Sequence, residues 1–140
     1  MKKYTITIAE VHLRLLSEVT EKMARTIVGQ LDYGILEECE AAIDRHYPEL
    51  EFEDRHSMVE YTKNALDEIH QYCWRQQGNA RYGVGYSAKS DMLWDIYEVL
   101  RHQLWQERKD KSVMTVDSDK PFHWNKKIPL IEIVKISDDE

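Results

Sequence analysis

The sequence predicts a mostly helical α+β fold, with about four helices and a small sheet formed by one strand from each end of the chain. Apolar residues recur every three or four positions through most of the chain, which is typical of amphipathic helices. The two ends differ, because residues 4–8 alternate and residues 128–136 form an apolar, β-branched run. A chain of 140 residues, 42% of them hydrophobic, suits a single globular domain over 1–140.

Residues 4–8 read Tyr-Thr-Ile-Thr-Ile, which places the tyrosine and both isoleucines on one side of a strand. The period changes near Ala9, and the pattern then predicts one helix that ends near Gly29-Gln30. Leu13 fits the helical stripe poorly, so a second strand over 11–15 is an open alternative. The predicted core stripe of this helix comprises Leu16, Val19, Met23, Ile27 and Leu31, and it is widened by Val11, Leu15 and Val28.

A turn at 32–34 and a second helix from about Ile35 to His46 are expected next, and Pro48 ends that helix. A third helix is predicted from Ser57 to about Gln77. Ser57 and Glu60 form a capping-box pattern at its start, and Gly78-Asn79 is typical of a helix end.

The fourth helix is predicted from Ser90, as its N-cap, to about Lys109. A short strand at 113–116 and a loop at 117–127 then lead to the closing strand at 128–136 and the acidic tail at 138–140. Because a two-stranded ribbon is marginal alone, we expect the terminal strands to pack on the helices or to gain 113–116 as a third strand.

The formal net charge of −7 argues against a protein that binds nucleic acid directly, because phosphate contacts need a basic face. Eleven acidic and three basic residues lie in the segment 37–68. Such a segment is usually a solvated surface. The more specific hypothesis is that it binds a basic protein.

The chain has no charged and apolar leader and no apolar run near the roughly 18 residues of a membrane helix. We therefore expect a cytoplasmic protein with no membrane partner. Cys39 and Cys73 lie at apolar positions of the predicted helices, so two reduced, buried thiols are expected.

Several motifs together resemble a group of small, uncharacterised proteins encoded by bacteriophages and prophages. They are Tyr-Gly-x-Gly-x-Ser at 82–87, Asp-Ile-Tyr-x-Val-x-Arg-His at 95–102, the opening at 4–8 with a helix that ends in Gly29-Gln30, and the closing Pro-Leu-Ile-Glu-Ile at 129–133. The closing segment departs from the pattern, which has a second proline and a lysine there. The resemblance implies a phage or prophage origin and a bacterial host cell, and it transfers no catalytic residue.

The glycine loop at 81–87 is the first candidate site. Gly83 and Gly85 permit positive φ or close backbone approach, and exposed amides in such loops can cradle an anion. The loop lacks the Gly-Lys-Ser/Thr of a phosphate loop, so a structural loop with its tyrosines packed on the helices is the plainer interpretation. The candidate contact residues here are Arg81, Tyr82, Gly83, Gly85, Tyr86 and Ser87.

Arg101 and His102 are the second candidate. Arg101 follows Glu98 by three residues, which predicts an ion pair on one helix face. His102 follows Glu98 by four residues, a spacing that suits a shared metal, but nothing places a third ligand there. We therefore predict no metal and no cofactor.

An alternative is an enzyme similar to the all-α nucleotide pyrophosphohydrolases, which hold Mg²⁺ with Glu-x-x-Glu on one helix and Glu-x-x-Asp on the next. Glu37 and Glu40 fit the first half of this pattern. Glu53 begins the second half, where His56 replaces the required aspartate.

The stronger prediction is a non-enzymatic accessory or protein-interaction module with no catalytic residue. We expect its partner to be another protein or a second copy of the chain. Self-association would use the terminal strands or the flank formed by Trp94 and Trp105.

Overall fold

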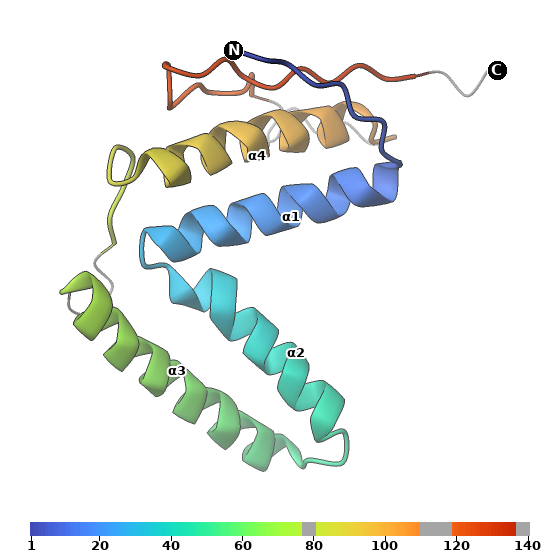
Figure 1. The fold of residues 1–140 in the computed structure, drawn as a ribbon. Coiled ribbons are helices and arrows are strands. Elements are labelled where there is room, and N and C mark those ends of the chain that lie inside the picture. Colours follow the sequence, from blue (N-terminus) through green and yellow to red (C-terminus); the bar gives the residue numbers. More distant parts are fainter. Residues whose placement is uncertain (77–80, 110–118, 137–140) are drawn as a thin grey trace.

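The computed structural model describes residues 1–76, 81–109 and 119–136, and these contain four α-helices and a short π-helix. Figure 1 shows two antiparallel helix pairs, α1 with α4 and α2 with α3, which diverge from the turn after α1. In chain order the elements are α1 (Glu10–Ile27), η1 (Asp32–Leu36), α2 (Glu37–His46), α3 (Phe52–Trp74) and α4 (Ala88–Gln106).

The predicted α+β fold is wrong, because the described part of the chain is helical and contains no β-strand. Residues 4–8 and 128–136 are extended and lie on the side of α4 that faces away from α1 (Figure 1). Tyr4 is 83% exposed and Ile6 is 79% exposed, so the alternating side of the first segment buries little apolar surface. The strand predicted at 113–116 lies outside the described residues, as does the acidic tail.

Carboxylates of α4, rather than another strand, hold the backbone of the C-terminal segment. The two oxygens of Asp95 accept hydrogen bonds from the N–H groups of Trp124 (2.5 Å) and Asn125 (2.9 Å). Glu98 accepts a third bond, from the N–H of Phe122 at 3.3 Å. These donors belong to residues 122–125, so the carboxylates fix the path of the chain into residues 128–136.

The first predicted helix is confirmed as α1, and the alternative strand over 11–15 is wrong. Its end is a Schellman motif, in which Gly29 has φ +89°. The N–H of Gly29 donates to Thr26 O at 3.0 Å, and the N–H of Gln30 donates to Arg25 O at 2.9 Å. This motif turns the chain away from α1 and toward η1.

The face of α1 that packs on α4 is not the stripe that the apolar pattern predicted. Leu16, Val19 and Met23 are each at least 44% exposed. The buried residues of the helix are instead Ser17, Thr20 and Ala24, and Leu13 is half-buried beside them. Small side chains let two helices approach closely, which explains why the polar side of α1 forms the contact.

α4 is covered on all sides, since no residue from 90 to 105 is exposed. This explains why Trp94 and Trp105 are half-buried although they lie off the apolar line of the helix. That line comprises Leu93, Ile96, Leu100 and Leu104. Ser90, the predicted N-cap, is instead in the first turn, where it is 1% exposed and its hydroxyl donates to Ala24 O at 3.2 Å. The N-cap residue is Ser87.

The turn predicted at 32–34 is the π-helical segment η1, which continues into α2. Gly34 makes this path possible, because a Cβ there would lie 2.2 Å from Thr26 Oγ1 and 3.0 Å from the Lys22 carbonyl oxygen. The glycine therefore lets η1 approach α1 more closely than any other residue would.

α3 begins at Phe52, so the capping box predicted at Ser57 is wrong. Ser57 lies inside the helix and its hydroxyl donates to Glu53 O at 3.0 Å. Acidic residues in the first turn, Glu53 and Asp54, favour this earlier start. The helix ends at Trp74, and the end predicted at Gly78-Asn79 lies outside the described residues.

Both cysteines are free thiols, but the prediction that both are buried is wrong. Cys39 is half-buried, whereas Cys73 is exposed, because α3 is covered along one side only. Across the ranges that the structure describes, no helix is long and apolar enough to cross a membrane.

Candidate functional site

The glycine loop joins the two helix pairs. The backbone N–H of Tyr82 donates to Val28 O at 3.2 Å, just after α1, and its hydroxyl donates to Trp74 O at 3.0 Å, at the end of α3. The ring of Tyr82 stacks on that of Tyr86 with 4.0 Å between centroids. This geometry agrees with a structural role for the tyrosines.

Gly85 does not offer a free amide to an anion. Its φ of +85° favours glycine, and its N–H points at both carboxylate oxygens of Asp91, at 3.1 and 3.2 Å. A negative charge already occupies the place where the anion would lie. Gly83 has open space around its Cα, and Ser87 makes no side-chain cap bond.

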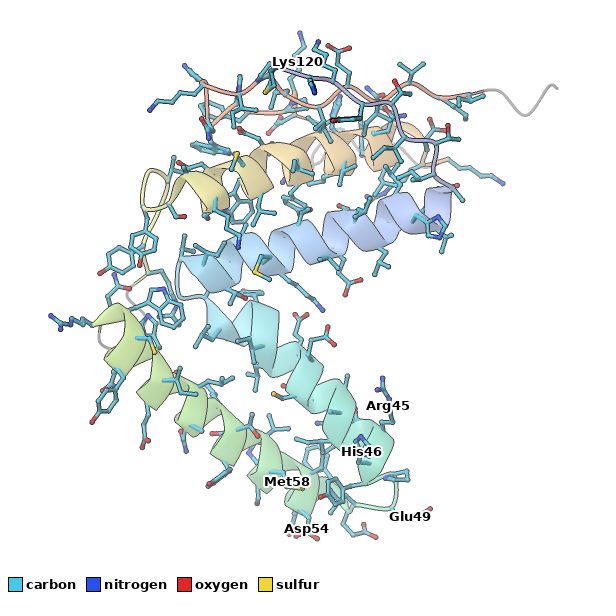
Figure 2. The ribbon with its side chains drawn as sticks, viewed as in Figure 1. Arg45, His46, Glu49, Asp54, Met58 and Lys120 are labelled. Atoms are coloured by element: carbon cyan, nitrogen blue, oxygen red, sulfur yellow. The ribbon has the colours of Figure 1, made fainter. Side chains whose placement is uncertain are left out.

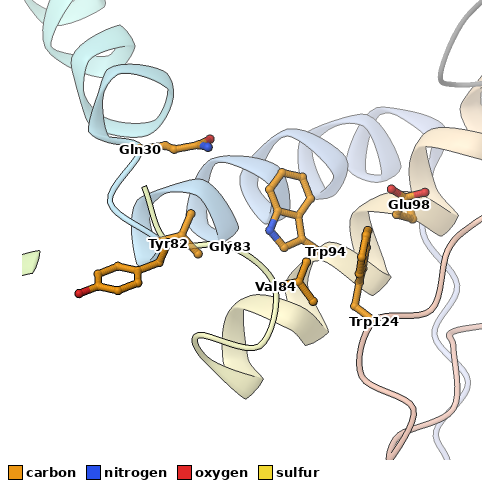
Figure 3. A pocket seen from close by; sticks show the side chains of 8 residues that line it. Gln30, Tyr82, Gly83, Val84, Trp94, Glu98 and Trp124 are labelled. Carbon is orange, nitrogen blue, oxygen red and sulfur yellow. The ribbon is translucent and has the colours of Figure 1, made fainter. Parts of the chain in front are cut away.

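A pocket of about 250 Å³ lies between the loop, the end of α1, α4 and the C-terminal segment (Figure 3). Of the predicted site residues, it includes Tyr82 and Gly83. Its two indoles, Trp94 and Trp124, were not in the predicted set. The complete lining is Val28, Gln30, Tyr82, Gly83, Val84, Trp94, Glu98 and Trp124.

Arginines neutralise the acids next to this pocket. Arg101 lies 3.1 Å from Glu98, which confirms the predicted ion pair, and it also lies over the ring of Tyr97. Arg25 pairs with Glu21 at 2.7 Å and stacks over Trp94 at 5.2 Å from the ring centroid. The pocket therefore has compensated charges and an aromatic wall.

Burial raises the pKa of Tyr97, and the negative charge of Glu21 adds to that effect. Tyr97 is thus held neutral on the buried side of α4. It serves as a packing residue and as a partner for Arg101, which lies over its ring.

The remaining predicted residues do not gather at the pocket. Arg81 lies 3.9 Å from Asp32 and lines a second cavity of about 60 Å³. His102 contacts Gln106 through its Nε2 at 3.0 Å and stacks on Trp105. The residues of the two candidate sites are therefore spread over three environments.

His70 lines the second cavity and is only 2% exposed. Its Nε2 has no hydrogen-bond partner among the described residues. The ring packs against Gly29, where a Cβ would lie 2.9 Å from His70 Cδ2, and it stacks on Trp74. His70 thus packs between α3 and the turn after α1.

The carboxylates of the enzyme alternative do not converge. Glu37 lies 3.3 Å from Lys22, and Glu40 lies 3.9 Å from Arg55. Glu53 is in the first turn of α3. In the ranges that the structure describes, no group of three or more His, Cys, Asp or Glu side chains is placed to hold a metal ion.

The acidic segment 37–68 forms most of the α2–α3 hairpin. Figure 2 shows Arg45, Glu49 and Asp54 near its tip, at the end away from α1 and α4. Arg55 bonds to Asp44 at 2.6 Å, and this hydrogen bond holds the pKa of Asp44 below its usual range. Lys22 does the same for Glu38, at 2.7 Å, and so joins α1 to α2.

α1 exposes a row of apolar side chains on the side that does not pack on α4. We define the α1 face as Val11, Leu15, Leu16, Val19 and Met23, which are 44–67% exposed. Residues 11, 15, 19 and 23 repeat every four positions, so they form one ridge. This ridge lies roughly opposite the buried face of α1 and therefore points away from α4.

Comparisons of the chain with protein-family models, curated proteins and solved structures find no match. The sequence predicted the α1 face as part of a core stripe, because its apolar residues recur with the period of one. The signal that was available is the second, small-residue face of the same helix, Ser17, Thr20 and Ala24.

Proposed function

We propose that this protein is a non-enzymatic interaction module, of phage or prophage type, that binds a protein through the α1 face. One observation carries the proposal: α1 packs on α4 with its small and polar residues and leaves its large apolar residues exposed. The helix is amphipathic, but its apolar side is not the side that the chain covers.

The free energy of apolar burial supports this assignment. Contact with a partner stabilises a complex by about 25 cal/mol per Å² of apolar surface removed from water. Monomeric proteins rarely expose contiguous apolar patches larger than a few hundred Å². Five large side chains along one helix face match the anchor pattern of helix-mediated recognition.

Two further features favour binding over catalysis. The pocket beside the glycine loop contains paired charges and aromatic rings, with no nucleophile next to a base. Glu37 and Glu40, the acids of the enzyme alternative, are engaged with basic side chains.

The test is site-specific photocrosslinking in bacterial cells that produce the protein. Benzoylphenylalanine replaces Leu15 in the α1 face or, as the matched control, Tyr61, which is 77% exposed on α3. We expect one discrete product heavier than the 16.7 kDa chain from position 15 and none from position 61. Loss of the product from position 15, or the same products from both positions, would contradict the proposal.

A further inference from the structure

We infer that the partner of the α1 face is a second copy of this chain, and that two α1 helices pack antiparallel about a two-fold axis. This inference rests on the proposed function and names the partner of the same surface. Three observations support it: the symmetry of the ridge, the charge of α1 and the area that the chain leaves exposed.

The ridge is symmetric about residue 17. Positions 11 and 23 lie equally far from that point, as do positions 15 and 19. In an antiparallel two-fold contact, Val11 therefore meets Met23 of the partner subunit, and Leu15 meets Val19 of the partner subunit. A two-fold interface requires a surface that is complementary to itself, and this ridge has that property over about 18 Å.

The charges of α1 favour a copy of itself over a charged partner. The helix contains three acidic residues, Glu10, Glu18 and Glu21, and three basic residues, Arg14, Lys22 and Arg25, so its net charge is zero. Each basic residue pairs with a glutamate four positions earlier. Two such helices meet without net repulsion although each chain carries −7. A basic partner would instead be attracted to segment 37–68.

The exposed area leaves room for a second copy. The chain exposes 10,893 Å², whereas a compact monomer of 16.7 kDa exposes about 7,600 Å². The α1 face is one part of this excess, together with the extended residues 4–8 and the exposed side of α3.

The experiment is size-exclusion chromatography with light scattering of the purified chain from about 1 to 100 µM, a range chosen to cover moderate affinities. We expect a mass twice that of the 16.7 kDa chain for the wild type and the monomer mass for L15E/V19E. The control Y61E/Y72E changes two exposed residues of α3, 77% and 88% exposed, and should remain dimeric. Circular dichroism should show equal helix content in all three, since every changed side chain is at least half exposed.

Cysteine crosslinking tests the direction of the helices, with Cys39 and Cys73 replaced by serine. The double variant V11C/M23C should form an intermolecular disulfide under mild oxidation, because the two positions oppose each other in the antiparallel pair. V11C alone should not, because its two copies lie about 18 Å apart along the axis. A crosslink from V11C alone would overturn the antiparallel arrangement.

The outcomes separate this inference from the proposed function. A wild-type monomer throughout the concentration range, or a dimer that survives L15E/V19E, overturns the second copy as the partner. If position 15 still crosslinks to another protein, the proposed function stands without this inference. If the chain is monomeric and position 15 gives no crosslink, both are overturned.

Discussion

The carboxylate of Asp95 accepts a hydrogen bond from the backbone N–H of Trp124, at 2.5 Å and 29 residues later in the chain. Its other oxygen accepts from the N–H of Asn125 at 2.9 Å. Asp95 is 6% exposed, so these bonds are shielded from water. One side chain of α4 thus anchors the segment that brings Trp124 to the pocket.

Replacement of Asp95 by alanine should therefore destabilise the protein. Two backbone donors lose a charged acceptor, and bonds to charged groups each contribute about 1.5–3 kcal/mol, so we expect a loss of about 3 kcal/mol in the free energy of unfolding. Urea denaturation measures it, and Trp124 should become more exposed to a fluorescence quencher. The control Glu49→Ala, on the exposed tip of the α2–α3 hairpin, should change stability by less than about 0.5 kcal/mol.

The two glycines Gly34 and Gly83 should respond in opposite ways to alanine. A Cβ at position 34 would lie 2.2 Å from Thr26 Oγ1, so Gly34→Ala forces η1 away from α1 and should cost about 1–3 kcal/mol. No atom lies within 4 Å of a Cβ at position 83, so Gly83→Ala should be close to neutral. Thermal denaturation of both variants makes the comparison. Equal melting temperatures would contradict the close approach of η1 to α1.

Two serines near the start of α4 should also differ. The buried hydroxyl of Ser90 donates to Ala24 O, and Ser90→Ala should reduce stability by about 1 kcal/mol. Ser87 is at the N-cap position but makes no side-chain bond to the helix. Ser87→Ala should therefore cost less than Ser90→Ala in chemical denaturation. The reverse order would show that Ser87 caps the helix in solution.

Acid should weaken the attachment of α2. Hydrogen bonds from Arg55 and Lys22 lower the pKa values of Asp44 and Glu38 in the folded chain. A group with a lowered folded pKa contributes stability above its unfolded pKa, about 4 for these carboxyls, and the contribution is lost as the pH falls through the folded pKa. Stability should fall from pH 5 toward pH 2.

The variant Arg55→Gln separates the contribution of one pair. It removes the donor to Asp44, so this variant should show a shallower loss of stability in the same pH range. Denaturation midpoints at pH 7, 5, 4 and 3 provide the measurement. Identical pH profiles for the variant and the wild type would mean that the exposed pair contributes nothing measurable, as is common for surface pairs.

The helices were predictable because helix formation is local. The three- and four-residue repeat, the stop at Pro48 and the glycine after α1 all act within a few positions of the chain. The start of α4 was misplaced because both Ser87 and Ser90 suited an N-cap, and tertiary contacts decided between them. Ser90 is used against α1 instead. The start of α3 was misplaced because Ser57 suited a capping box, whereas the acidic residues Glu53 and Asp54 favour the earlier start at Phe52.

The candidate site was predictable only in part. The loop at 81–87 was identified, and Tyr82 and Gly83 do line the pocket. Trp124 lines the same pocket because its backbone N–H donates to Asp95. The two residues are 29 positions apart, and no local sequence pattern predicts such a bond.

The amino-acid sequence by itself determined where the chain is helical and that α1 has one large apolar side. It also determined the β preference of residues 4–8, but that preference forms no sheet without a paired strand, and these residues are exposed in the structure. Only the tertiary structure decided which side of α1 is covered. Close approach to α4 requires the small residues Ser17, Thr20 and Ala24, so the large apolar residues lie on the other side of α1 and remain exposed.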